Sequence, residues 1–219
     1  MKILFNDIIQ YSNAHETLKS PMLTDYYNVA SDILIILDRT RAINSIGIGN
    51  TNAAFFNITF DNGVVFNFNF TNSGLYPMSR PVTTSRIIIN TNATYIGRIG
   101  AGIGIRIPTS IRKEPGFAST SVPRYTLSGQ VIPGLGGYNY RTLSLDSRYK
   151  LNLESMKEIE EGYNFIGRGY PFFIDLSDES YKLTYDKLYA TDKNQNKLSF
   201  ESSVFKPLFS RRWDFEERF

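Results

Sequence analysis

The first pattern that could form a ligand site is a set of three glycines at alternate positions. Gly100, Gly102 and Gly104 are separated by single residues, and clustered glycines can cradle a phosphate when a helix follows them. The spacing differs from G-x-G-x-x-G, no helix is expected after it, and no P-loop Lys-Ser/Thr is present. Alternating glycines instead predict a strand with one bare face, which another backbone or side chain can approach closely.

The single histidine, His15, offers little for metal binding or nucleophilic catalysis. The chain has no cysteine and no second imidazole, so a His- or Cys-based metal site is not expected. A Ser-His-Asp triad would have to recruit His15 from a loop-like segment, and no G-x-S-x-G motif is present. We therefore expect an ordinary surface histidine, no metal and no cofactor.

Carboxylates are harder to dismiss, because glycoside hydrolysis needs only two of them at a suitable separation. Asp146, Glu114, Asp175 and Asp178 are candidates, but 21 acidic residues make accidental pairs common. The run from Asp175 to Glu179 carries oxygen ligands suited to Ca²⁺ without the spacing of an EF-hand. A solvated turn is the simpler interpretation of this run, and we do not expect an enzyme.

Two aromatic-rich segments are suited to contacts rather than to bond breaking. The C-terminus, residues 210–219, reads as a strand with Trp213 and Phe215 on one face and residues of alternating charge on the other. A terminal strand that closes its own sheet is the alternative. The candidate assembly contacts are Arg212, Trp213, Asp214, Phe215, Glu216 and Arg218.

A glycine-rich loop precedes two exposed tyrosines. Gly134 to Gly137 permit tight turning between strands, and Tyr138 and Tyr140 lie at the expected tip of this loop. These two tyrosines are candidate loop contacts for a ligand or partner, and a plain connector is the alternative.

Composition narrows the possible partners. A net charge of +3, spread over dispersed basic residues, is too small for the footprint of a nucleic-acid-binding protein. The most apolar run, Ile33 to Leu37, is far shorter than the ~20 residues that cross a bilayer, so no membrane insertion is expected. Asn6 and Asp7 interrupt the apolar start, which argues against a signal peptide and for synthesis in the cytoplasm.

Alternating phenylalanine and asparagine predict a β-hairpin. Phe66, Phe68 and Phe70 point to one side of a strand, while Asn67 and Asn69 point to the other. The preceding strand covers residues 56–60, and Asn62-Gly63 between the two favours a type I′ turn. This hairpin should have one buried face and one wet face.

Other apolar runs predict a mainly β chain. Residues 86–90 and 94–99 read as a further strand pair around a turn at 91–93. The remaining expected strands are Asp32–Asp38, Ala42–Gly49, Gly100–Ile107, Arg124–Ile132, Arg141–Arg148, Pro171–Leu176, Lys182–Thr191, Lys197–Phe205 and Ser210–Phe219.

One amphipathic helix is expected from about Leu153 to Ile166. Its apolar side chains recur at helical spacing, Asn152 can cap its start, and Gly167 can end it. Together with the strands, this gives the expected fold class: mainly β, as a β-sandwich or jelly roll, with one amphipathic helix in a β-rich C-terminal half. We divide the chain into a loop-rich N-terminal arm (1–30), a jelly-roll-like β-sandwich (31–112) and a β-rich assembly domain (113–219).

Residues 113–219 resemble the C-terminal portion of tail and baseplate-type structural proteins of tailed bacteriophages. The similarity lies in Arg124–Gly129, Arg141–Leu145, the acidic helix, Pro171–Ile174 and Trp213–Glu217. Residues 32–38 and 43–48 are similar to two early core strands of a galactose-binding-type jelly roll. These resemblances carry over no catalytic residue.

The expected function is therefore that of a virion structural protein in a tail, baseplate or neck. Its partners would be copies of itself and other virion proteins, joined through strand edges and wrapped by the N-terminal arm. The alternative is a carbohydrate-binding or host-adhesion module that recognises a cell-surface glycan.

Overall fold

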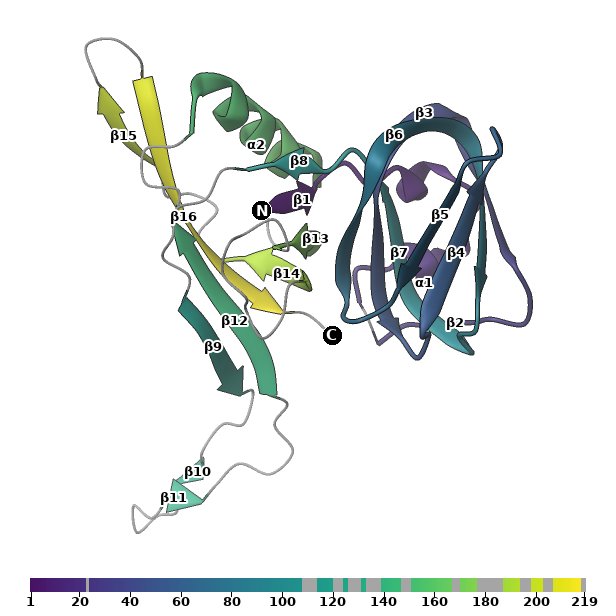
Figure 1. The fold of residues 1–219 in the computed structure, drawn as a ribbon. Coiled ribbons are helices and arrows are strands. Elements are labelled where there is room, and N and C mark those ends of the chain that lie inside the picture. The colour runs from purple at the N-terminus through teal and green to yellow at the C-terminus, as the bar shows by residue number, and fades with distance from the viewer. Residues whose placement is uncertain are drawn as a thin grey trace.

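The computed structural model describes most of the N-terminal half and a discontinuous set of segments beyond it. The backbone is described for residues 1–22, 24–107, 114–119, 124–125, 131–132, 139–146, 151–166, 170–176, 187–193, 198–202 and 207–217. Within these segments the chain is mainly β, with antiparallel sheets packed as a sandwich and one helix longer than two turns (Figure 1). The expected fold class is confirmed.

The first sheet has six antiparallel strands, and two of them are long enough to bend across both of its layers. Its order is β2 (Tyr27–Asn28), β7 (Tyr95–Gly102), β3 (Ile33–Thr51), β6 (Gly74–Thr91), β4 (Phe55–Phe60) and β5 (Val65–Asn69). The first part of β3 pairs with the end of β6, next to β4 and β5. The second part of β3 pairs with the start of β6 and with β7.

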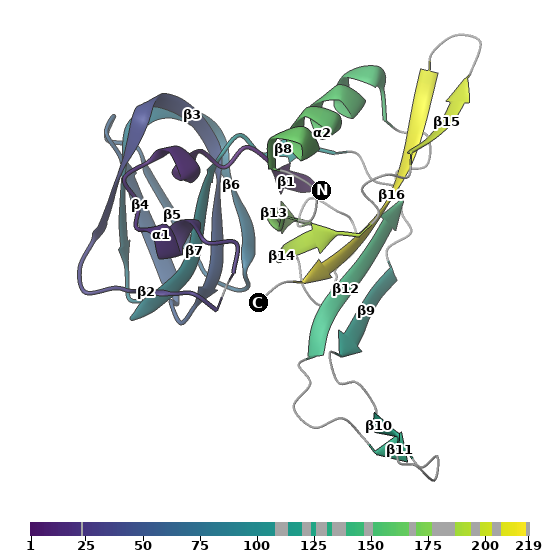
Figure 2. The same ribbon diagram turned by 180° about the vertical axis from the view of Figure 1, so that it is seen from behind.

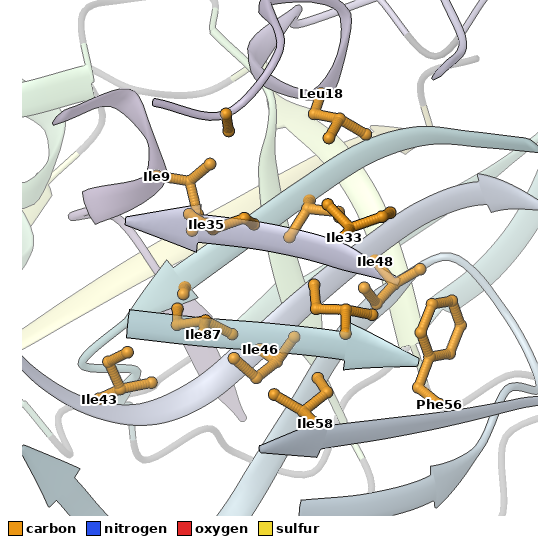
Figure 3. Packing of buried hydrophobic residues seen from close by; sticks show 14 of the residues in the cluster. Ile9, Leu18, Ile33, Ile35, Ile43, Ile46, Ile48, Phe56, Ile58 and Ile87 are labelled. Carbon is orange, nitrogen blue, oxygen red and sulfur yellow. The ribbon is translucent and has the colours of Figure 1, made fainter. Parts of the chain in front are cut away.

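Register shifts between Ile36 and Arg41 mark the bend of β3. The two strands predicted at 32–38 and 42–49 are therefore one strand that changes layer. The sheet thus folds over on itself and encloses an apolar core, in which Ile33 and Ile35 of one layer meet Ile46 and Ile48 of the other (Figure 3).

The predicted pairing of residues 86–90 with 94–99 is wrong. β6 pairs with β3 and β4, whereas β7 pairs with β2 and β3. Residues 91–95 therefore carry the chain from one layer of the sandwich to the other rather than closing a hairpin.

The second sheet combines strands from both ends of the chain. Its order is β8 (Ile105–Arg106), β1 (Lys2–Leu4), β13 (Phe172–Asp175), β14 (Lys187–Asp192), β16 (Pro207–Glu217), β12 (Asn139–Asp146) and β9 (Glu114–Ser119), with β15 (Leu198–Ser202) also paired to β16. The strand predicted at 124–132 contains two shorter ones, β10 (Arg124–Tyr125) and β11 (Val131–Ile132), which pair with each other.

Helix α2 (Leu153–Ile166) covers one face of the second sheet, as both views show (Figures 1 and 2). Met156, Ile159 and Tyr163 are buried against Trp213 and other residues of that sheet, at the spacing expected from the sequence. The Asn152 side chain accepts a hydrogen bond of 2.8 Å from the backbone N–H of Ser155, so the predicted N-cap is confirmed. None of the described helices is long and apolar enough to cross a bilayer.

The N-terminal segment differs from the loose arm that the sequence indicated. β1 lies inside the second sheet, between β8 and β13. The short helices η1 (Ile8–Tyr11) and α1 (Glu16–Lys19) add Ile9 and Leu18 to the first core (Figure 3). Most apolar side chains of residues 1–18 are buried within the chain, and their burial stabilises the monomer. The segment therefore ties the two sheets together instead of extending from the body.

The predicted hairpin is confirmed, but its turn is of another type. β4 pairs with β5, with Phe56 opposite Phe68 and Ile58 opposite Phe66. Gly63 has a φ of +77° and donates its N–H to the carbonyl of Phe60, whereas the φ of Asn62 is not positive. A type I′ turn requires positive φ at both central residues. The connection is instead a three-residue loop that ends in a left-handed glycine.

The two sheets pack on each other through a small apolar seam. Leu4, Leu75, Phe173 and Tyr189 form a separate buried cluster between them. Gly47 lies directly opposite Leu75 on one side and Gly100 on the other. The ring of Phe173 occupies the space that a Cβ at Gly47 would need and lies 2.8 Å from one built at Gly100. The bare strand face is confirmed at Gly100, where Phe173 is the side chain that approaches it. The single strand predicted from Gly100 to Ile107 is wrong, because β7 ends at Gly102 and β8 belongs to the second sheet.

Candidate binding surface

The predicted assembly contacts on β16 divide between the two faces of the second sheet. Trp213 and Phe215 are 0% and 2% exposed and belong to the core under α2. Arg212 is exposed, and Asp214 and Glu216 are half-buried on the opposite face. The alternation expected for this strand is present, but only its polar side is accessible in the monomer.

Charged residues on that polar face are paired within the chain. Asp214 accepts hydrogen bonds from Arg212 Nε at 3.1 Å and from the Ser144 hydroxyl at 2.5 Å. Lys193 lies 3.0 Å from Glu216. Exposed ion pairs of this kind contribute only ~0.2–1 kcal/mol, so they chiefly orient the side chains. Arg218 and Tyr138 lie outside the described residues, and Tyr140 is described only as part of the β12 backbone.

Beneath β16, a buried cluster joins the sheet to α2. The Asp192 carboxylate accepts hydrogen bonds from Arg211 at 2.9 Å and from the Tyr163 hydroxyl at 2.6 Å. Burial and the neighbouring Asp192 carboxylate raise the pKa of Tyr163. The Arg211 guanidinium also lies over the Tyr163 and Trp213 rings. These groups are enclosed by the core, so the cluster stabilises the fold and is closed to a substrate.

A second buried pair fixes the N-terminal segment against the first sheet. Arg98 Nη2 lies 2.9 Å from Asp7 Oδ2, and Arg98 also donates to the carbonyl of Lys19. Asp7 accepts backbone hydrogen bonds from Ile9 and Ala101 as well. Burial raises the pKa of Asp7 against the opposing effects of Arg98 and these donors. These partners belong to the N-terminal segment and to β7, so the pair holds that segment against the first sheet.

The carboxylates singled out in the sequence do not form a described catalytic pair. Asp175 is fully buried in β13 and lies 3.5 Å from Lys187, so it is not part of a solvated turn. Asp178 lies outside the described residues, as do the side chains of Glu114 and Asp146. Within the described part of the chain, no three His, Cys, Asp or Glu residues are close enough to hold a metal ion. His15 is exposed and caps α1 by accepting a hydrogen bond from the backbone N–H of Thr17.

The candidate binding surface is the outer face of the layer built from β4, β5 and parts of β3 and β6. We call it the open face, because none of the described residues covers it. In cross-strand register it carries an apolar row and a polar row. The apolar row is Leu34, Ile88 and Val65, interrupted by Thr59, and the polar row is Asn90, Asn57 and Asn67.

The open face is unusually apolar for a surface without a partner. Leu34, Ile36 and Val65 are 44%, 48% and 49% exposed. Single exposed apolar residues are common, but here three of them share one sheet face, with Leu34 and Val65 at the two ends of the same cross-strand row.

A shallow hollow of about 290 Å³ includes Asn57 and Asn67 of the polar row. It is lined by Phe55, Asn57, Asn67 and Asn69 together with Phe56 and Phe68. Phe55 is 40% exposed and stands opposite Asn69 in the hairpin. The sequence placed Asn67 and Asn69 on a wet face, but it gave no sign that Asn57 and Phe55 complete a hollow with them, because that depends on the register of the hairpin.

The hairpin that carries this hollow is anchored to β6 by Asp61. Its carboxylate accepts hydrogen bonds from the backbone N–H and hydroxyl of Ser85, both at 2.7 Å, and from the Thr84 hydroxyl at 2.8 Å. These donors lower the pKa of Asp61 to about 2. The anchor holds the two-stranded hairpin in place although β5 has a neighbour on one side only.

Comparison of this chain with protein-family models, with curated proteins and with solved structures found no match in any of the three.

Proposed function

We propose that this chain is a structural subunit that binds copies of itself through the free edge of β5, without a catalytic step. The observation that carries this proposal is the hydrogen-bonding pattern of the edge. Phe60 pairs with Val64 and Ala54 with Phe70 through backbone bonds. Because such bonds alternate along an antiparallel pair, the backbone groups of Val65, Asn67 and Asn69 point away from β4, towards the free edge.

Within the described part of the chain, this edge lacks the devices that normally prevent strands from pairing between molecules. Proteins protect free edges with charged residues, proline, bulges or a covering segment. β5 contains Val65, Phe66, Asn67, Phe68 and Asn69, with no charge and no proline. No described residue outside β4 pairs with it. An unprotected edge of this kind favours the addition of a strand from a neighbour.

A second copy of the chain fits this edge without electrostatic conflict. In an antiparallel arrangement about a two-fold axis at Asn67, Val65 would face Asn69 of the second copy, and Asn67 would face its counterpart. Three hydrogen-bonded residue pairs would then form across the axis, each exchanging two N–H···O bonds. Such a contact uses the same patch on both subunits, as closed two-fold dimers do.

The similarity of residues 113–219 to phage tail and baseplate-type proteins supports a finer proposal. We infer that the assembly is the tail, baseplate or neck of a virion and that other virion proteins are further partners. The folded-over first sheet is compatible with the jelly-roll similarity of residues 32–48. On β16, the accessible Arg212, Asp214 and Glu216 offer a polar surface for such neighbours, since charged rims set partner choice.

The self-association proposal is tested by native mass spectrometry and sedimentation velocity on the full chain. Val65→Pro removes an N–H that points to the free edge while leaving the bonds to β4 intact, and proline is tolerated on edge strands. We expect the wild-type protein to form dimers or larger oligomers, and Val65→Pro to be monomeric at the same concentration. Val65→Thr keeps the N–H and is the matched control, which should still associate.

A monomeric wild-type protein, or a Val65→Pro variant that associates as the wild type does, would contradict the role of this edge. The virion proposal has its own test, because mass spectrometry of purified virions should detect the chain in multiple copies. Its absence from such particles would remove the virion proposal and leave self-association standing.

A further inference from the structure

We propose that the hollow formed by Phe55, Asn57, Asn67 and Asn69 binds a neutral carbohydrate, one pyranose ring at a time. This inference goes beyond self-association and does not depend on it, because the hollow lies on the face of the hairpin and not on its edge. The proposed carbohydrate site lies on the surface of a sheet and not on a loop.

The four side chains come from two adjacent cross-strand pairs. Phe55 is opposite Asn69, and Asn57 is opposite Asn67. Both are non-hydrogen-bonded pairs, since the backbone bonds of this hairpin involve the residues between them. Side chains of such pairs lie close together on one face. The sheet therefore fixes one aromatic ring and three amides around a single hollow on a rigid support.

Several other asparagines in or next to the strands of the first sheet have a structural task. Asn52 exchanges hydrogen bonds with Thr94, Asn92 accepts one from Ala54, and Asn90 donates one to Asp32 at 2.8 Å. By contrast, no side-chain hydrogen bond to another described residue is found for Asn57, Asn67 or Asn69. Their donors and acceptors are free to bind a ligand.

The chemistry of the lining selects the ligand class. No charged side chain lines the hollow, so nothing in it offsets the desolvation of a phosphate, sulfate or carboxylate. A purely apolar ligand would leave three amides without partners. A pyranose fits both requirements, because its hydroxyl groups donate and accept like amides while its C–H face packs against an aromatic ring such as Phe55.

The shape of the hollow predicts weak binding. Its volume of about 290 Å³ is just below the range of ~300 to ~1,000 Å³ that is usual for small-molecule sites. It is also shallow, so much of a bound ring would remain in contact with water. We expect a dissociation constant on the order of millimolar, which becomes useful when many copies are displayed together.

Saturation-transfer-difference NMR on the full chain tests this site. The probes are the methyl pyranosides of glucose, galactose, mannose and N-acetylglucosamine, with methyl glucuronoside as the charged counterpart. We expect saturation transfer to at least one neutral probe and weaker transfer to the glucuronoside. Phe55→Ala should weaken binding about tenfold or more because the stacking surface is lost.

Ile36→Ala is the matched control, since it removes an exposed apolar side chain from the same face outside the hollow. It should bind as the wild type does. A second variant, Asn67→Ala, keeps the aromatic ring and should also weaken binding. Lack of transfer to every neutral probe, preference for the glucuronoside, or unchanged binding by Phe55→Ala would overturn the assignment.

The two proposals can fail separately. Val65→Pro is expected to lose self-association and to keep the saturation transfer, because Val65 does not line the hollow. A variant that loses oligomers and still binds sugar leaves the carbohydrate site intact, whereas an oligomer that binds none of the neutral probes rejects the site alone.

Discussion

The first sheet has two outer faces, which differ in whether other parts of the described chain cover them. The face formed by β7 with parts of β3 and β6, which we call the closed face, is lined by glycines and receives Phe173 from the second sheet. The open face carries exposed apolar side chains and a row of asparagines, and no described residue covers it. The same strands, β3 and β6, contribute to both faces.

This difference separates the face that is packed by the same chain from the face that is left exposed. On the closed face, small residues at 47 and 100 give up side-chain area so that a large ring from the same chain can fit. On the open face, Leu34 and Val65 are exposed, and the side chains of Asn57 and Asn67 make no hydrogen bond to another described residue. We infer that residues of the closed face contribute mainly to stability and that residues of the open face contribute mainly to binding. The following substitutions test that contrast.

The largest difference in the free energy of unfolding is expected between alanine substitutions of two phenylalanines on opposite faces. Phe173→Ala removes a ring that is 2% exposed and should destabilise the protein by about 3–5 kcal/mol. Phe55→Ala, on the open face, should change the free energy of unfolding by about 0.5 kcal/mol or less. Urea unfolding followed by tryptophan fluorescence measures both. Equal losses would mean that the two faces do not differ in their structural role.

A comparable contrast exists between two Asp–Arg pairs. Arg98→Met leaves the buried Asp7 carboxylate without its cation, and we expect a loss of about 3–5 kcal/mol. Arg41→Met breaks the pair with Asp38 at the protein surface and should cost ~1 kcal/mol or less. Thermal unfolding of both variants beside the wild type provides the measurement. If Arg41→Met lowers thermal stability strongly and Arg98→Met lowers it little, the buried pair is not the one that stabilises the fold.

Substitution by alanine should separate the stability of the two faces further. Gly47→Ala forces the new Cβ against the ring of Phe173, and we expect destabilisation of about 1–3 kcal/mol from overpacking. On the open face, Asn57→Ala should be close to neutral because its side chain makes no described hydrogen bond. If Gly47→Ala folds with wild-type stability, the ring is not held as tightly as the seam requires.

The smallest expected effect concerns the pH dependence of the open-face hairpin. The pKa of Asp61 is lowered from its ordinary value of 3.8 to about 2, so its ionised form stabilises the fold above pH 3.8, and this contribution is lost as the pH falls towards 2. Asp61→Asn should therefore be less stable than the wild type near neutral pH, with a gap that narrows between pH 3.8 and 2. Unfolding curves at a series of pH values report this gap. A gap that stays constant with pH would show that the carboxylate charge does not anchor the hairpin.

Local features of this fold could be predicted from the sequence, and non-local ones could not. The alternation of Phe66 to Phe70 predicts the hairpin, and the spacing of Met156, Ile159 and Tyr163 predicts α2, because each pattern is set by neighbouring residues. The Asn62-Gly63 pair was less informative, since Gly63 alone adopts positive φ and the turn is therefore not type I′. Adjacent strands at 86–90 and 94–99 suggested a pair that the bending of the sheet prevents.

The same limit applies to the candidate site. Strand parity correctly separated Trp213 and Phe215 from Arg212, Asp214 and Glu216, but it could not say which face would be buried. Asp7 and Arg98 are 91 positions apart, and no local pattern around either residue predicts that they pair. Phe55 and Asn57 join Asn67 and Asn69 only through cross-strand register, so the hollow became visible only with the fold.

The most direct test of the open edge is residue-resolved hydrogen–deuterium exchange in the dilute and the associated protein. The backbone N–H groups of Val65, Asn67 and Asn69 should exchange fast in the monomer and become protected on association, while those of Phe66 and Phe68, already bonded to β4, should be protected in both states. Protection that appears at alternate residues of β5 would support the account. Exchange at Val65, Asn67 and Asn69 that is equally fast in both states would contradict it.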